Sequence, residues 1–172
     1  MKRYQLAGTE IPVMFSTNYS MRPRGVEPEL IVLHSTCGAY EGALRWLCSP
    51  RSLVSAHFLV ARDGQRAAQI VPTERAAWHA GVSCYDHREH VNNWSVGIEM
   101  EHMDSEDDWP EEQLRAVADI CAQLLAVYGI APDAIVSHAE VAVPAGRKVD
   151  PVDFPWEQFT VYLNDARQTK GE

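Results

Sequence analysis

The chain has 172 residues, 46% of them hydrophobic, with a formal net charge of -9 at pH 7 and a mean hydropathy of -0.25. This length and composition fit one globular domain with a sizeable core, and argue against a disordered or membrane-embedded chain. The acidic balance argues against nucleic acid or an anionic membrane surface as the main partner, because both need a basic face.

Neither a targeting segment nor a disulfide framework is evident. Residues 1–10 contain two basic residues but no apolar segment of the length that a secretory signal requires. No run approaches the roughly 18 apolar residues of a transmembrane helix. We therefore expect a cytoplasmic monomer without membrane insertion, or a protein released by a route that reads no signal. The cysteines are scattered and are expected to be free thiols: Cys37, Cys48, Cys84 and Cys121.

The first third of the chain predicts an arm, a strand and a helix. Residues 1–29 contain prolines and glycines with little periodicity, which predicts an irregular arm packed on the domain, with one short strand near Pro12–Phe15. The apolar run Leu30–His34 contains β-branched residues and predicts a buried strand. Apolar residues at helical spacing predict a helix over Tyr40–Cys48, which Ser49 and Pro50 end.

The middle third predicts mainly strands. Two apolar runs, 55–62 and 69–72, flank Asp63-Gly64 and predict a β-hairpin. Residues 73–91 lack a clear period and predict a long surface excursion that carries binding residues. Ser95–Glu101 predicts another strand. Eight of the 24 acidic residues lie between Glu99 and Glu112, which favours a solvated loop and helix start over a calcium site, because no ordered Asp-x-Asp-x-Asp-Gly loop is present.

The last third predicts the clearest helix. Residues 110–128 carry one apolar stripe at helical spacing, with acidic residues in the first turn and Gly129 after the end. Ile135–His138 predicts the last core strand and Trp156–Leu163 a closing helix, and the tail 166–172 is expected to fray. Residues 30–165 therefore predict a single α/β domain with a mixed central β-sheet flanked by helices.

Two histidines end apolar runs, which is an unusual place for this residue. Either His34 or His138 alone is more often structural than a ligand. Together with Asp150 they form a His, His, Asp set, which is one way to hold zinc with three protein ligands and an open fourth position. We therefore expect one catalytic Zn2+ at these three residues.

A hydrolytic zinc site also needs a proton acceptor and a positive group for the oxyanion. Glu99, at the end of the Val96-Gly97-Ile98 run, can supply the first, and Lys148, two residues before Asp150, can supply the second. Singly, each of these two fits a solvated surface charge better. Glu101 shares a face with Glu99 and competes for the base role, but Glu99 directly follows the apolar run and is preferred.

Seven motifs, spread in order over about residues 30–160, carry a resemblance to a known family. They are Ile31-Val32-Leu33-His34, Val54-Ser55-Ala56-His57-Phe58-Leu59-Val60, Arg62-Asp63-Gly64, Ala77-Trp78-His79-Ala80-Gly81, Ser95-Val96-Gly97-Ile98-Glu99, Ser137-His138 and Arg147-Lys148-Val149-Asp150-Pro151. The set resembles the zinc-dependent N-acetylmuramoyl-L-alanine amidases of the type 2 family, which includes phage lysozyme-like amidases, cell-wall recycling amidases and peptidoglycan-recognition proteins.

The resemblance implies hydrolysis of the amide bond between the lactyl group of N-acetylmuramic acid and L-alanine, with peptidoglycan or a muropeptide as substrate. It implies roles for eight residues: zinc ligation by His34, His138 and Asp150, catalysis by Glu99 and Lys148, and substrate contact by His57, Trp78 and His79. For Trp78, a place in the core is an equal alternative.

The branch of the family is left open. Asp150 in place of a cysteine, and Ala56 where some phage members carry tyrosine, resemble the recycling branch. The brief segment between His34 and His57 instead favours a phage or envelope enzyme, released to the cell wall by a holin-type or other signal-independent route. The sequence departs from the family's usual motifs at Pro151-Val152-Asp153 and in the longer loop 141–146, and these departures leave the local shape of the cleft open.

The alternative function is a peptidoglycan-binding module without catalysis, but such members typically lack a metal ligand, and here all three positions are filled.

Overall fold

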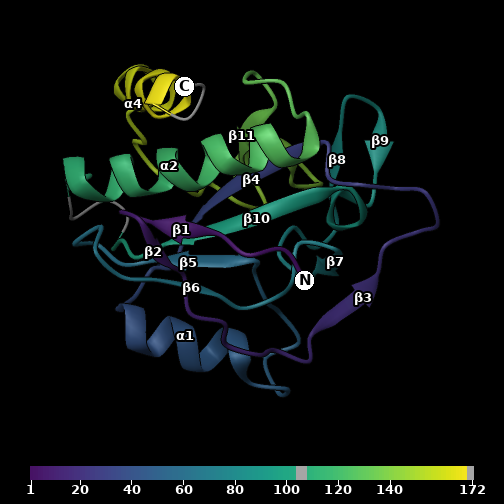
Figure 1. Ribbon diagram of the computed structural model, residues 1–172. Coiled ribbons are helices and arrows are strands. Elements are labelled where there is room, and N and C mark those ends of the chain that lie inside the picture. Colours follow the sequence, from purple (N-terminus) through teal and green to yellow (C-terminus); the bar gives the residue numbers. More distant parts are fainter. Residues whose placement is uncertain (104–107, 170–172) are drawn as a thin grey trace.

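A five-stranded mixed sheet forms the centre of the fold (Figure 1). The structure is a computed structural model that describes residues 1–103 and 108–169. From edge to edge its strands are β11 (Ile135–Ser137), β4 (Leu30–Ser35), β10 (Ser95–Met100), β5 (Phe58–Val60) and β6 (Ala67–Gln69). The first four run parallel, and β6 is antiparallel to β5. The predicted α/β class with a mixed sheet is confirmed.

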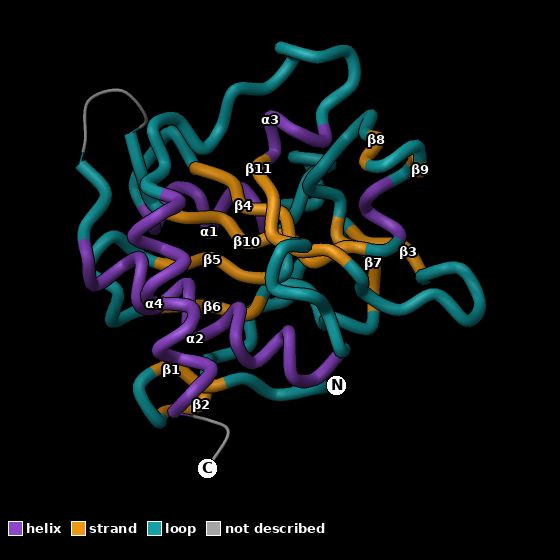
Figure 2. Tube along the Cα trace, turned by 90° about the horizontal axis from the view of Figure 1, so that it is seen from above, coloured by secondary structure: helices purple, strands orange, loops and turns teal. Residues whose placement is uncertain are grey.

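Helices cover both faces of this sheet (Figures 1 and 2). One face packs against α2 (Glu111–Tyr128), which in turn packs against α4 (Trp156–Thr169), and α1 (Tyr40–Cys48) lies on the other side. Side chains of β4 alternate between the two sides: Ile31 and Leu33 join the cluster under α2, while Leu30 and Val32 join a cluster on the opposite face. Since both faces are covered, all six residues of β4 are buried.

Segments with strong periodicity form the elements that were predicted. The helix over Tyr40–Cys48 has the expected bounds. The helix α2 begins at Glu111 and ends at Tyr128, followed by Gly129 in the left-handed region at φ 67°. The hairpin of β5 and β6 is also present, although its second strand is Ala67–Gln69 and not 69–72.

The prediction of a surface excursion over residues 73–91 is wrong for its first half. Residues 75–77 form β7 (Arg75–Ala77), which pairs with β3 (Tyr19–Met21) of the arm. Ala76, Ala77 and Ala80 have no exposed surface. This burial depends on pairing with a strand more than fifty residues away, which no local pattern reveals. The second half forms the small hairpin of β8 (Cys84–Tyr85) and β9 (Arg88–Glu89).

The arm contains more regular structure than its composition predicted. It holds β1 (Gln5–Leu6), paired with β2 (Thr9–Glu10), and the strand β3. Near Pro12–Phe15 there is only an isolated bridge between Val13 and Gln69, in place of the expected strand. The arm packs on the domain through Tyr4 and Ile11, which are 1% and 2% exposed and belong to the main core.

The carboxyl-terminal end also differs from expectation. Helix α4 continues to Thr169, so residues 166–169 are helical and not a frayed tail. Residues 170–172 of that tail lie outside the described residues, as do residues 104–107 in the middle of the acidic stretch. Among the residues that the structure describes, no helix has the length and apolar character needed to cross a membrane.

Candidate active site

Side chains at the carboxyl ends of three adjacent parallel strands meet on the sheet face opposite α2. In β4, His34 follows Leu30 and Val32 in the alternation, and it pairs in register with Glu99 of β10. His138 follows β11 two residues after Val136, which lies in the same cluster as Leu30 and Val32. The carboxyl ends of parallel strands are the usual location of ligand sites in such sheets.

The strand predicted over Ile135–His138 ends one residue early, at Ser137, because a short helix begins there. His138 is the first residue of α3 (His138–Val141). Ser137 caps this helix: its Oγ accepts from the Glu140 N–H at 3.1 Å, and its own N–H donates to Oε2 of Glu140 at 2.7 Å. The Ser-x-x-Glu pattern of this capping box was visible in the sequence. It fixes the position from which His138 projects.

His34, His138 and Asp150 form a cluster that can hold a metal ion. Each offers one ligand atom, and these atoms all lie within 4.8 Å of one another. Oδ2 of Asp150 lies 3.1 Å from Nδ1 of His138 and 3.6 Å from Nδ1 of His34. The backbone N–H of Ala139 donates to the Asp150 carbonyl at 3.1 Å, which ties the Asp150 segment to the start of α3. The three predicted ligands are thus brought together.

The protonation of this cluster suits metal binding. Burial lowers the pKa of His34 to about 4, so its imidazole is neutral near pH 7. Burial alone would raise the pKa of Asp150, but the adjacent rings of His138 and His34 outweigh it and hold that pKa well below its usual range. A neutral imidazole and an ionised carboxylate are the forms that bind metal ions.

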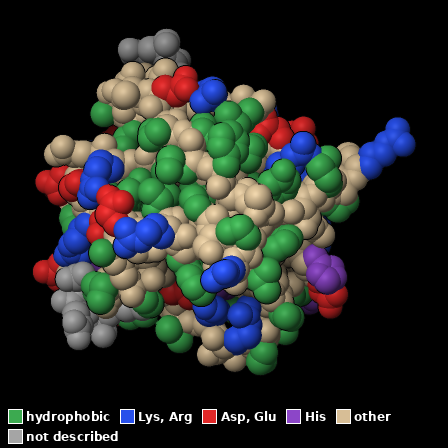
Figure 3. All heavy atoms as spheres, turned by 90° about the horizontal axis from the view of Figure 1, so that it is seen from below, with side chains coloured by type: hydrophobic (Ala, Val, Ile, Leu, Met, Phe, Trp, Pro, Cys, Tyr) green, Lys and Arg blue, Asp and Glu red, His purple; other side chains and the backbone are tan. Residues whose placement is uncertain are grey.

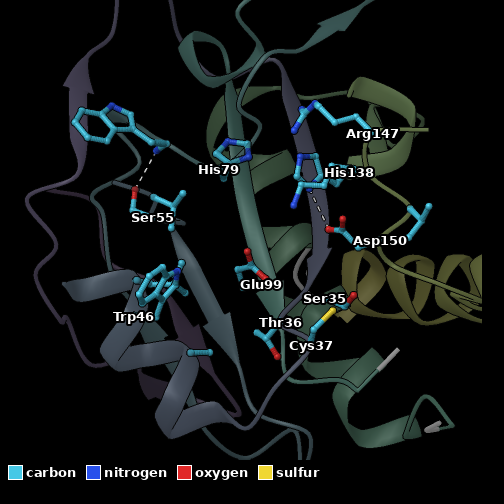
Figure 4. A pocket seen from close by; sticks show the side chains of 16 residues that line it. Ser35, Thr36, Cys37, Trp46, Ser55, His79, Glu99, His138, Arg147 and Asp150 are labelled. Carbon is cyan, nitrogen blue, oxygen red and sulfur yellow. Dashed lines mark hydrogen bonds and ion pairs between the residues drawn. The ribbon is translucent and has the colours of Figure 1, made fainter. Parts of the chain in front are cut away.

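A pocket of about 470 Å³ opens over this cluster, and both Glu99 and Lys148 line it. In Figure 4, Glu99 rises from β10 between Trp46 on one side and the pair of His138 and Asp150 on the other. Glu101, the competing carboxylate, is engaged elsewhere: it accepts backbone N–H groups of Tyr40 and Arg62, each at 2.8 Å. Geometry therefore favours Glu99 over Glu101 as the carboxylate of the site.

Of the three residues expected to contact substrate, two line the pocket. Trp78 and His79 do so, whereas His57 is fully buried and lies outside the pocket lining. Its Nδ1 accepts from the Gly97 N–H at 2.9 Å, and its Nε2 lies 3.0 Å from the Arg75 carbonyl. This corrects the expectation for His57: the same pairing of β3 and β7 that buries Ala76 and Ala77 also covers this ring.

Three residues that line the pocket or support its lining were given no role from the sequence. Trp46 projects from α1 with 58% of its surface exposed. The molecule seen from below, the side on which α1 lies in Figure 1, has hydrophobic side chains scattered among charged ones (Figure 3). The position of Trp46 off the apolar stripe of its helix was the available signal. Arg147 donates to the carbonyls of Ala80 at 3.0 Å and Val82 at 2.7 Å. Asn92 accepts the backbone N–H groups of His79 and Ala80, and no local pattern marks it.

Comparisons with known proteins agree with this geometry. The family described as N-acetylmuramoyl-L-alanine amidase matches residues 24–153. The chain is 33% identical to the 1,6-anhydro-N-acetylmuramyl-L-alanine amidase AmpD of Salmonella typhimurium, over 84% of this chain and 85% of that protein. It is 31% identical to the N-acetylmuramoyl-L-alanine amidase AmiD of Escherichia coli, over 76% of this chain and 51% of that protein.

Solved structures are similar in fold as well as in sequence. A crystal structure of an AmpD derivative superimposes with a TM-score of 0.80 and 28% identity, over 89% of this chain and 94% of that one. AmiD from E. coli, in complex with anhydro-N-acetylmuramic acid-L-Ala-D-γ-Glu-L-Lys, gives a TM-score of 0.71 and 26% identity, over 93% of this chain and 65% of that one. Because the family model, a curated relative and a solved structure all match most of its length, the chain belongs to the type 2 family of N-acetylmuramoyl-L-alanine amidases.

Proposed function

We propose that this protein is a zinc-dependent hydrolase of the amide bond between the lactyl group of N-acetylmuramic acid and the L-alanine of the peptide stem. One observation carries the proposal: the ligand atoms of His34, His138 and Asp150 converge within 4.8 Å, beside a pocket that Glu99 and Lys148 also line. Family membership supplies the bond that is cut.

The three residues fit a zinc ion. Two imidazole nitrogens and one carboxylate form a donor set that zinc accepts, and three protein ligands leave one position for water or substrate. Bonds of about 2.0–2.1 Å in a tetrahedral arrangement separate the ligand atoms by about 3.3 Å. The two separations that involve Asp150, 3.1 and 3.6 Å, lie on either side of that value, and all three separations are within 4.8 Å. When bound, the ion supplies Lewis-acid polarisation of the scissile carbonyl and lowers the pKa of a water molecule.

Two side chains of the pocket carry the proton and charge chemistry in this proposal. Glu99 accepts the proton of the attacking water and passes it to the nitrogen of L-alanine, so that the new C–O bond forms and the C–N bond breaks with the leaving group as a neutral amine. Lys148 donates a hydrogen bond to the oxygen of the scissile carbonyl, where negative charge develops. Lys148 is exposed at the pocket rim, so substrate can approach it from solvent.

We propose a soluble anhydro-muropeptide as the preferred substrate. Support comes from the relatives named for the 1,6-anhydro sugar, which the chain resembles along most of their length, and from the substrate bound in the AmiD complex. The brief segment between His34 and His57 pointed to a phage or envelope enzyme. We give it less weight, because it concerns one loop and not the whole chain.

Mass spectrometry of the products tests the proposal. Purified protein is incubated with an anhydromuramyl peptide and, separately, with whole peptidoglycan, and the expected products are a free peptide beginning with L-alanine and the corresponding sugar. Cleavage at another bond would overturn it. A His34→Ala variant that keeps both zinc and amidase activity would overturn the ligand assignment. Binding of muropeptide without any product would instead favour the alternative, a recognition module without catalysis.

A further inference from the structure

A chain of hydrogen bonds leads from the His34 ring into the protein interior. Nε2 of His34 lies 3.0 Å from Nδ1 of His79, and Nε2 of His79 lies 3.1 Å from Oγ of Ser95. The Ser95 hydroxyl in turn donates to the carbonyl of Val91 at 2.7 Å. The side chains of His34, His79 and Ser95 are all buried.

The direction of every hydrogen bond in this chain follows from its last member. A carbonyl oxygen only accepts, so the Ser95 hydrogen points to Val91, and the Ser95 oxygen accepts from Nε2–H of His79. A neutral imidazole carries one proton, so Nδ1 of His79 has none and accepts from Nε2–H of His34. The lone pair of His34 is then on Nδ1, the atom that faces Asp150.

The second histidine of the cluster has an acceptor at each ring nitrogen. Nε2 of His138 lies 3.4 Å from the carbonyl of Ala80, and Nδ1 lies 3.1 Å from Oδ2 of Asp150. When a metal ion takes the place of the proton on Nδ1, the remaining proton is on Nε2 and is donated to the Ala80 carbonyl. The Nε2 contacts of His34 and His138 therefore come from two consecutive residues, His79 and Ala80.

The segment that supplies these two contacts is fixed at both residues. Oδ1 of Asn92 accepts the backbone N–H of His79 at 3.1 Å and that of Ala80 at 2.8 Å. Arg147 donates to the Ala80 carbonyl at 3.0 Å. The ring of His79 also lies against Gly97, where a side chain would overlap it.

We propose that His79 sets the proton position of His34, and that the Ala80 carbonyl accepts the Nε2 proton of His138, so that both ligands present Nδ1 to the metal ion. This rests on the proposed function, and it makes His79 a positioning residue and not a substrate contact. Partners of this kind orient a ligand ring and select its tautomer, and their loss typically lowers metal affinity by about 10- to 100-fold.

Two variants test the role of His79, and their new side chains have the same number and branching of non-hydrogen atoms. Asn places an amide oxygen, a hydrogen-bond acceptor, near the position of Nδ1, whereas Leu places a methyl group there. We expect His79→Asn to bind zinc within about threefold of the wild type and His79→Leu to bind about 10- to 100-fold more weakly. The measurement is competition against a chromophoric zinc chelator without substrate, with thermal unfolding as the check on folding. Equal zinc affinity of the two variants would overturn the inference.

A spectroscopic measurement on the metal-free wild type tests the proton position directly. Long-range proton–nitrogen NMR of histidine-labelled protein distinguishes a protonated from an unprotonated ring nitrogen. We expect the His34 proton on Nε2, and loss of that single tautomer in Ser95→Ala. A proton on Nδ1 in the wild type would overturn the inference whether or not the protein is an amidase. A wild-type chain that fails to bind zinc would overturn the proposed function as well, whereas equal variants in a zinc-binding chain overturn only the inference.

Discussion

The ring of His79 lies so close to the backbone of Gly97 that a Cβ atom on residue 97 would overlap the ring. Gly97→Ala should therefore displace His79 and disturb its contact with His34. We expect zinc affinity to fall about tenfold or more, and the free energy of unfolding to fall by about 1–3 kcal/mol through overpacking. Chelator competition and urea unfolding measure the two effects.

Gly42 of α1 offers a matched control for this substitution. A Cβ atom built there has no atom within 4 Å, so Gly42→Ala should leave zinc affinity unchanged and stabilise the helix by about 0.5–1 kcal/mol. If Gly97→Ala and Gly42→Ala bind zinc equally well, the close packing of His79 on Gly97 does not matter for the metal site.

Arg22 of the arm connects several segments behind the site. Its guanidinium donates to the carbonyls of Thr73, Asn92, Asn93 and Ser95. Arg22→Leu leaves these acceptors without their donor, and we expect the free energy of unfolding to fall by about 2–4 kcal/mol. Urea unfolding measures this, with Arg24→Ala as the control. Arg24 is exposed, so its loss should change stability by no more than about 0.5 kcal/mol; similar losses in both variants would contradict the prediction.

The buried His57 predicts a dependence of stability on pH. Burial, together with the nearby charge of Arg22, lowers its pKa to about 3 in the folded chain, below the value of about 6.5 in an unfolded chain. Between these pH values the unfolded chain binds a proton that the folded chain does not. Stability is therefore full above pH ~6.5 and declines as the pH falls toward 3.

The contribution of His57 to this decline is on the order of 2 kcal/mol between pH 7 and pH 5. We expect His57→Asn, which keeps an acceptor for the Gly97 N–H but does not titrate, to reduce the difference in unfolding free energy between the two pH values by about that amount. Urea unfolding with a chelator present measures it. His87→Asn, at an exposed position, is the control and should leave the difference as in the wild type.

Local patterns predicted the elements that carry the metal cluster. The apolar strand that contains His34 and the amphipathic helix α2 follow from the local pattern of apolar residues alone. A helix buried on one face has apolar residues at helical spacing, and a fully buried strand is a short continuous apolar run. The pairing of His34 with Glu99 follows from two such strands lying side by side. The site's framework is therefore encoded within short segments.

The surroundings of the cluster depend on contacts between distant segments. His57 resembled a cleft residue, but the pairing of β3 with β7 and the guanidinium of Arg22 enclose it. Asn92 stands in a polar stretch with no period, and its importance arises only from the two backbone N–H groups that it accepts. Such interactions join residues of different segments, which are 12 positions apart for Asn92 and Ala80 and 35 for Arg22 and His57, so inspection of one segment does not reveal them.

Glu99 and Glu101 provide the sharpest test of the catalytic assignment, because both carboxylates lie at the carboxyl end of β10: Glu99 is in the strand, and Glu101 directly follows its last residue, Met100. Glu99 lines the pocket, so Glu99→Gln should lower kcat about 100- to 10,000-fold while zinc stays bound. Glu101 instead accepts two backbone N–H groups, so Glu101→Gln should lower the free energy of unfolding by about 1–2 kcal/mol and keep kcat near the wild-type value. Product formation per bound zinc, measured below the unfolding temperature of both variants, separates these effects. An equal loss of kcat in the two variants would remove Glu99 from the role of proton acceptor, since a shared defect would come from damage to the strand and not from the missing carboxylate.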